Sequence, residues 1–89
     1  MREYTQYYDA NGVHFKGFTI RGCGTDTFYR EISKEEYDRL SAMSYAEVDS
    51  EINENLPSAV KYGYGYYGHA LLEENGMYFL GTTTGNSCD

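Results

Sequence analysis

Two Asn-Gly pairs, at Asn11-Gly12 and Asn75-Gly76, constrain the fold of this chain more than any other feature. Asn and Gly tolerate the positive φ angles of a type I′ turn, so each pair predicts a tight β-hairpin. With one hairpin near each end, the chain is expected to build an antiparallel sheet.

The residues around each turn predict how the strands pair. The expected cross-strand pairs are Tyr8 with Phe15, Tyr7 with Lys16, Leu72 with Phe79 and Leu71 with Leu80. Beyond Lys16 the apolar residues change from odd to even positions, and we expect a β-bulge at Gly17 to keep them on one face. The second hairpin is apolar on both faces, which favours a central place in the sheet.

The middle of the chain predicts one strand followed by two short helices. Residues 27–32 are rich in β-formers and alternate in polarity. Ser33-Lys34-Glu35-Glu36 and Ser44-Tyr45-Ala46-Glu47 each have the spacing of a capping box, in which the serine caps a helix and the glutamate reaches back. Pro57 is expected to end the second helix.

These elements predict an α+β fold in the order β-β-β-α-α-β-β, with about five antiparallel strands and two short helices on one face. The 89 residues are expected to form a single domain, 1–89, with a flexible C-terminal tail at 82–89. Eleven Tyr and four Phe predict an aromatic core. Several tyrosines should remain at the surface, because each buried hydroxyl needs a hydrogen-bond partner.

Negative charge is concentrated in the helical region. Eight carboxylates and two cations lie between Glu31 and Glu54, which gives −6 of the total net charge of −7. Glu47, Glu51 and Glu54 are spaced to share one helix face, and no Lys or Arg occurs from Leu40 to Val60. One interpretation is a solvated face whose carboxylates complement helix N-termini. The other is a surface that imitates nucleic-acid phosphates and binds a basic partner.

The segment Tyr62 to Gly68 alternates tyrosine with glycine. Such aromatics can stack on bases, but only Lys61 is nearby to hold a phosphate backbone, so the net charge disfavours direct nucleic-acid binding. Tyr64 and Tyr66 are instead predicted to pack in the sheet or to add contacts to a protein partner.

Four residues define an alternative class of function. Cys23, Cys88, His14 and His69 could form a metal or thiol-dependent site, although no two have the short spacing of structural zinc ligands. Both cysteines are expected to be free thiols, with a disulfide that ties down the C-terminus as the alternative. A third alternative is a homo-oligomer that buries its tyrosines against its own copies.

No segment reads as a signal peptide or a membrane span, so we expect a cytoplasmic protein, and no cofactor is expected because no cofactor motif occurs. In its size, α+β layout, acidic block and tyrosine-rich segment, the chain resembles small acidic counter-defence proteins of phages and mobile elements, among them anti-CRISPR proteins and DNA mimics. The resemblance implies a non-enzymatic inhibitor that acts in the cytoplasm of a bacterial host, where it occupies the nucleic-acid-binding surface of a nuclease or effector. The expected partner-binding residues are Glu35, Glu36, Asp38, Glu47, Asp49, Glu51, Glu54, Tyr64 and Tyr66.

Overall fold

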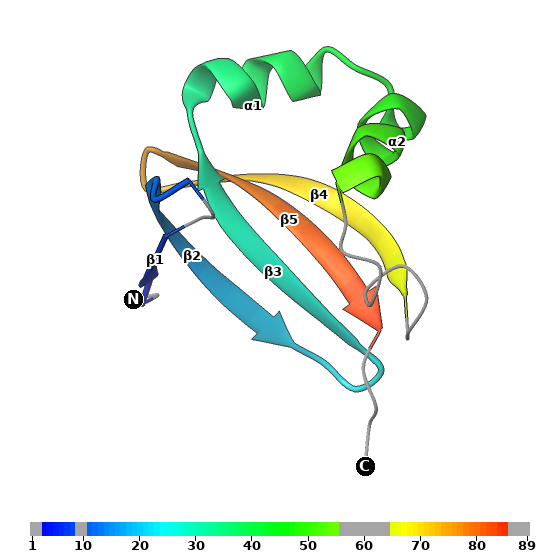
Figure 1. Ribbon diagram of the computed structural model, residues 1–89, viewed down its shortest axis with the longest axis horizontal. Coiled ribbons are helices and arrows are strands. Elements are labelled where there is room, and N and C mark those ends of the chain that lie inside the picture. The colour runs from blue at the N-terminus through cyan, green and yellow to red at the C-terminus, as the bar shows by residue number, and fades with distance from the viewer. Residues whose placement is uncertain (1–2, 9–10, 56–64, 86–89) are drawn as a thin grey trace.

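The computed structural model describes residues 3–8, 11–55 and 65–85. The strands form one antiparallel sheet in the order β1-β2-β3-β5-β4, and both helices lie on the same face of it (Figure 1). The predicted α+β class and element order are confirmed. The elements are β1 (Thr5–Tyr8), β2 (His14–Arg21), β3 (Thr25–Ile32), α1 (Lys34–Ser41), α2 (Tyr45–Asn55), β4 (Tyr66–Glu74) and β5 (Met77–Gly85).

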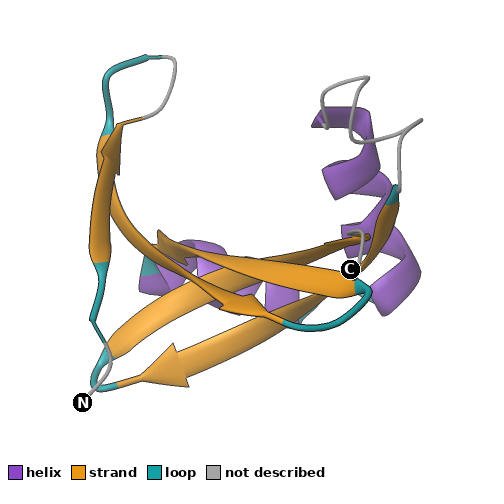
Figure 2. Cartoon of the chain, turned by 90° about the horizontal axis from the view of Figure 1, so that it is seen from below, coloured by secondary structure: helices purple, strands orange, loops and turns teal. Residues whose placement is uncertain are grey.

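The last strand lies inside the sheet, between β3 and β4. β5 pairs with the whole of β3, from Thr25 opposite Gly85 to Ile32 opposite Tyr78. The expected flexible tail is therefore wrong for residues 82–85, which belong to β5, while residues 86–89 lie outside the described part of the chain. Figure 2 shows the sheet strongly curved, with the β1–β2 hairpin at one end and α2 at the other.

The second predicted hairpin is confirmed in detail. Asn75 and Gly76 have φ angles of 53° and 76°, and Leu72 faces Phe79 as expected. The predicted central position holds only for β5, because β4 is an edge strand. An edge position still suits β4, since the helices cover part of its apolar surface.

The first hairpin forms with a register one residue away from the prediction. Tyr7 faces Phe15 and Tyr8 faces His14, so a longer connection replaces the two-residue turn; Asp9 and Ala10 lie outside the described residues. The observed register stacks the Tyr7 ring on Phe15 at 5.4 Å and sets its edge against Phe28 at 5.3 Å. These aromatic contacts account for the register.

The bulge predicted at Gly17 is wrong. β2 continues in regular register, with Gly17 opposite Arg30 and Phe18 opposite Tyr29. A Cβ atom on Gly17 would lie 2.8 Å from the Tyr29 carbonyl oxygen, so glycine is needed there for close approach. The change of apolar phase therefore sends successive aromatic residues to opposite faces of the sheet.

Both faces of the sheet bury side chains. On the helix face, Leu40 and Val48 are 4% and 2% exposed. On the opposite face, Phe79 is fully buried and Phe18 is 6% exposed. The Tyr4 ring covers them, since it stacks on Phe79 at 5.6 Å and meets Phe18 edge-on at 5.7 Å.

Local capping signals define both helix starts. The Ser33 hydroxyl accepts from the Glu36 amide at 3.0 Å, so the first cap is confirmed. Around Ser44 both arms of the capping box form, because its hydroxyl accepts from the Glu47 amide and its amide donates to the Glu47 carboxylate, each at 3.2 Å. These caps produce the turn between two helices that the sequence predicts.

Gly81 makes room for an aromatic ring at the centre of the sheet. Tyr29 lies directly opposite Gly81, and its ring also stacks on Phe18 at 4.8 Å. A Cβ atom on Gly81 would lie 2.5 Å from the Tyr29 ring. The ring therefore covers glycine backbone that would otherwise be open, as aromatic residues do for glycines in sheets.

We predict that Gly81→Ala lowers the free energy of unfolding by about 1–3 kcal/mol through overpacking. In a Tyr29→Val background, where the ring is absent, the same change should cost much less, because alanine restricts the unfolded chain more than glycine. Urea unfolding of the four proteins measures the coupling. Equal costs in both backgrounds would refute the role assigned to the ring.

Candidate functional site

One arginine joins the two helices through their acidic side chains. The Arg39 guanidinium pairs with Glu36 on its own helix and with Glu51 on α2, where Nη2 lies 2.7 Å from Oε1 and Nη1 lies 3.2 Å from Oε2. These bonds raise the pKa of Arg39 and lower the pKa of the Glu51 carboxyl. The stripe of Glu47, Glu51 and Glu54 has no Lys or Arg within its own helix, but α1 supplies a cation to it from the side.

Two further predicted partner-binding carboxylates take part in local contacts. Asp38 pairs with Lys34 one turn earlier at 2.8 Å, and this contact raises the pKa of Lys34. Glu47 completes the capping box of α2, and its bonds to the Ser44 amide and hydroxyl lower the pKa of its carboxyl. Both residues remain exposed, so these contacts fix their positions without removing their charge from the surface.

Asp49 points away from α1, toward β4. Its Oδ1 accepts from the Tyr66 hydroxyl at 2.5 Å and lies 3.2 Å from His69 Nδ1. The bond from Tyr66, and secondarily the one from His69, lowers the pKa of the Asp49 carboxyl. Burial of the Tyr66 hydroxyl raises its pKa, and the hydrogen bond to Asp49 and the charge of that carboxylate raise it further. This cluster holds α2 on the sheet.

Tyr45 closes the same cluster from outside. Its ring stacks on His69 at 4.1 Å, and its hydroxyl accepts from the His69 backbone amide at 3.3 Å. A Cβ atom on Gly68 would lie 2.6 Å from that hydroxyl, so the glycine leaves space for it. Because β4 is an edge strand, this bond satisfies a backbone donor that could otherwise pair with another chain.

The predicted partner-binding residues thus point in several directions. Glu35 and Glu54 are exposed, and no hydrogen bond or ion pair joins either carboxylate to a described residue. Tyr64 lies outside the described residues, and the Tyr66 hydroxyl is used internally. The two helices nevertheless keep seven carboxylates against Lys34 and Arg39, a net charge of −5.

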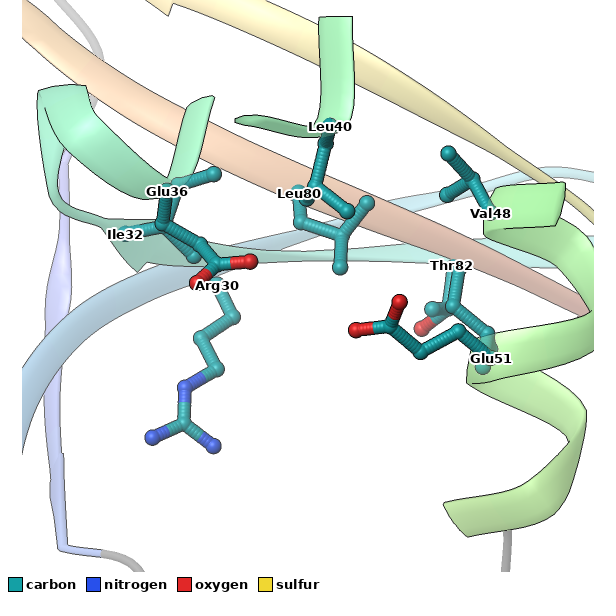
Figure 3. A pocket seen from close by; sticks show the side chains of 9 residues that line it. Arg30, Ile32, Glu36, Leu40, Val48, Glu51, Leu80 and Thr82 are labelled. Atoms are coloured by element: carbon teal, nitrogen blue, oxygen red, sulfur yellow. The ribbon is translucent and has the colours of Figure 1, made fainter. Parts of the chain in front are cut away.

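A groove lies between the two helices and the sheet (Figure 3). It has a volume of about 320 Å³ and an apolar floor that includes Leu40, Val48 and Leu80. Glu36 and Glu51 extend into the space between the helices from opposite sides in Figure 3, and Arg30 extends from β3. Carboxylates therefore frame an apolar depression on the helical side.

Sequence reasoning missed Tyr67 as an exposed aromatic. The β4–β5 register shifts between Tyr66 and Gly68, which leaves Tyr67 at a bulge with 64% of its surface exposed. Strict alternation along the tyrosine and glycine segment would put Tyr62, Tyr64 and Tyr66 on one side of the strand and glycine backbone on the other. The only available signal was the doubled Tyr66-Tyr67, which breaks that alternation.

The described residues of the alternative site, His14, Cys23 and His69, do not form one cluster. His14 begins β2 and lies tilted against the Tyr8 ring at 5.2 Å, whereas Cys23 lies beyond the other end of that strand. Within residues 3–8, 11–55 and 65–85, no three His, Cys, Asp or Glu side chains are placed to hold a metal ion.

The expected free thiol at Cys23 is wrong, because this residue is disulfide-bonded. Cys88 lies outside the described residues. Among the described helices, none is long and apolar enough to cross a bilayer.

No family model matches this chain, and no curated protein or solved structure matches it either.

We predict that Arg39→Met lowers the urea midpoint of unfolding at low salt and leaves a smaller deficit at about 1 M NaCl, where the screening length falls to roughly 3 Å. Because Arg39 links two helices, Arg39→Met should lower the urea midpoint more than the control Lys34→Met, which removes an ion pair within one helix. Equal deficits for the two variants would contradict the bridging role.

We predict that acid destabilises the wild type more than Asp49→Asn. The pKa of the Asp49 carboxyl is lower in the folded chain than in the unfolded chain. The stability that this carboxylate contributes is therefore complete above its pKa in the unfolded chain, and it is lost as the pH falls through its pKa in the folded chain. The unfolding free energy of the wild type should therefore fall more steeply between about pH 5 and pH 2. Glu54→Gln, which removes a carboxylate without a hydrogen bond or ion pair to any described residue, is the control and should keep the wild-type slope.

Proposed function

We propose that this chain is a non-enzymatic binding protein that uses its acidic helical side to occupy a basic surface on a partner protein. The observation that supports it best is the net charge of −5 on two helices that follow one another along one face of the sheet. Charge of one sign on one side of a small protein speeds encounter with an oppositely charged surface.

The internal ion pairs divide the acidic residues into two groups. Glu36, Asp38, Asp49 and Glu51 hold the helices in place, and their carboxylates are already engaged. Glu35 and Glu54 are exposed without such contacts, and Glu47 is exposed at the start of α2. In this proposal the first group positions the surface and the second meets the partner.

Rigid helices favour this use of charge. Arg39 fixes α1 to α2, and the cluster of Asp49, Tyr66 and His69 fixes α2 to β4. A preformed surface loses less conformational entropy on binding than a mobile one. The exposed ring of Tyr67 would add apolar contact area near α2.

A basic surface of this kind is typical of proteins that bind nucleic acid through phosphate contacts. We therefore propose a nuclease or nucleic-acid-binding effector as the partner, inhibited because this chain competes with nucleic acid for the same cations. The resemblance to anti-CRISPR proteins and DNA mimics belongs to this proposal.

The test is a pull-down from bacterial lysate with a helical variant, Glu35→Lys with Glu54→Lys, that leaves every internal ion pair intact. The control variant, Glu3→Lys with Glu73→Lys, changes net charge equally at exposed positions outside the helices. Recovery of the captured proteins should fall about tenfold for the helical variant and little for the control, in line with the lower range of electrostatic steering.

Two further measurements test whether this chain competes with nucleic acid for the partner's basic surface. A duplex DNA oligonucleotide should release the captured proteins, and higher salt should weaken capture by wild type and control alike. The proposal fails if the helical variant retains the same proteins as the wild type. It also fails if sedimentation shows a stable dimer that buries both helices.

A further inference from the structure

A second cavity lies on the other side of Leu40 and Val48 from the groove of Figure 3. It has a volume of about 240 Å³ and opens between the α1–α2 connection and β4. Its wall is mainly apolar, formed by Leu40, Met43, Tyr45, Val48 and Leu71. The polar side chains that line it, among the described residues, are His69 and Ser41, besides the Tyr45 hydroxyl.

His69 is buried and held in one orientation. Its side chain is 6% exposed, with the Tyr45 ring stacked on it. Nδ1 lies 3.2 Å from Asp49 Oδ1, and the same oxygen accepts from Tyr66. Because a carboxylate only accepts hydrogen bonds, Nδ1 carries the proton in this contact. In the neutral ring, Nε2 is then a hydrogen-bond acceptor.

Nε2 has no partner in the described part of the chain, since the side-chain bonds of His69 all use Nδ1. Every buried side-chain nitrogen or oxygen among the described residues has a partner, so Nε2 must reach solvent. Asp49 and Tyr66, which hold Nδ1, do not line the cavity. His69 does line it, so the edge of the ring away from Asp49, which carries Nε2, is the edge available to the cavity.

We propose that this cavity is a binding site for a small uncharged aromatic alcohol, a phenol, whose hydroxyl donates to His69 Nε2. An apolar pocket with one fixed polar group is the usual form of a small-molecule site. No Lys, Arg, Asp or Glu lines the cavity, so a charged ligand would lose its hydration without an opposite charge to pair with.

The wall also favours an aromatic ring over an aliphatic chain. Met43 offers a thioether, which makes favourable contacts with aromatic rings, and Tyr45 adds a ring of its own. The acceptor is positioned in advance by Asp49, so a bound hydroxyl would need no rearrangement of His69. This site does not depend on the acidic surface or on the proposed partner.

The experiment titrates isotope-labelled wild-type protein with phenol, toluene and anisole and follows the His69 ring signals and the Leu71 methyl signals by NMR. Toluene and anisole have similar size but no hydroxyl donor. We expect saturable shifts of both sets with phenol, and at least about fivefold weaker binding of the other two, as the loss of one hydrogen bond implies.

A second protein, His69→Phe, keeps a ring at this position and removes the acceptor. It should bind phenol and toluene equally, and Ser41→Phe, at the exposed end of α1, should reduce phenol binding while leaving the Asp49–His69 contact intact. Equal binding of phenol and toluene by the wild type overturns the proposal. NMR shifts that do not saturate with phenol, or that are largest at Leu80 in the groove of Figure 3, also overturn it.

Discussion

The pairing of β5 with β3 is the constraint on which the rest of the structure depends. It joins residues 25–32 to residues 77–85, across both helices and the second hairpin. Closing so long a loop costs chain entropy, and the contacts at the centre of the ladder must offset it. Those contacts are aromatic: Phe79 is fully buried, and the Tyr29 ring lies over Gly81. Once β5 occupies this place, β4 must pair on its far side, so the chain from β3 to β4 has to cross β5.

That crossing determines where the helices lie and which charges meet. α1 packs on β5 and α2 on β4, so the two helices follow one another across the same face of the sheet (Figure 1). Arg39 on α1 then reaches Glu51 on α2, and Asp49 on the other flank of α2 reaches Tyr66 and His69 on β4. Acidic side chains that share a sequence block thus serve two physical purposes. Some hold the crossing in place, and the others give the helical side its excess negative charge.

The features that could be predicted from the sequence are those set by neighbours a few residues away. Ser33 and Ser44 cap helices, and Asn75-Gly76 turns a hairpin, because each acts through its own backbone. The predictions failed where a strand distant in the sequence determines the local structure. Thr82 to Gly85 has the composition of a loose tail, yet β3 pairs with all of it, and Thr27 bonds Thr83 at 2.9 Å. The role of Asp49 was equally hidden, since its partners lie 17 and 20 residues further on.

The cluster around His69 connects the acidic surface with the cavity beside it. Asp49 holds α2 in place and also orients the imidazole whose Nε2 faces the cavity. Tyr45 begins α2, stacks on the same ring and lines the same cavity. Any molecule that binds there only when α2 is docked must stabilise the docked arrangement by mass action. The position of the exposed carboxylates on α2 would then become better defined, without any contact between that molecule and the acidic surface.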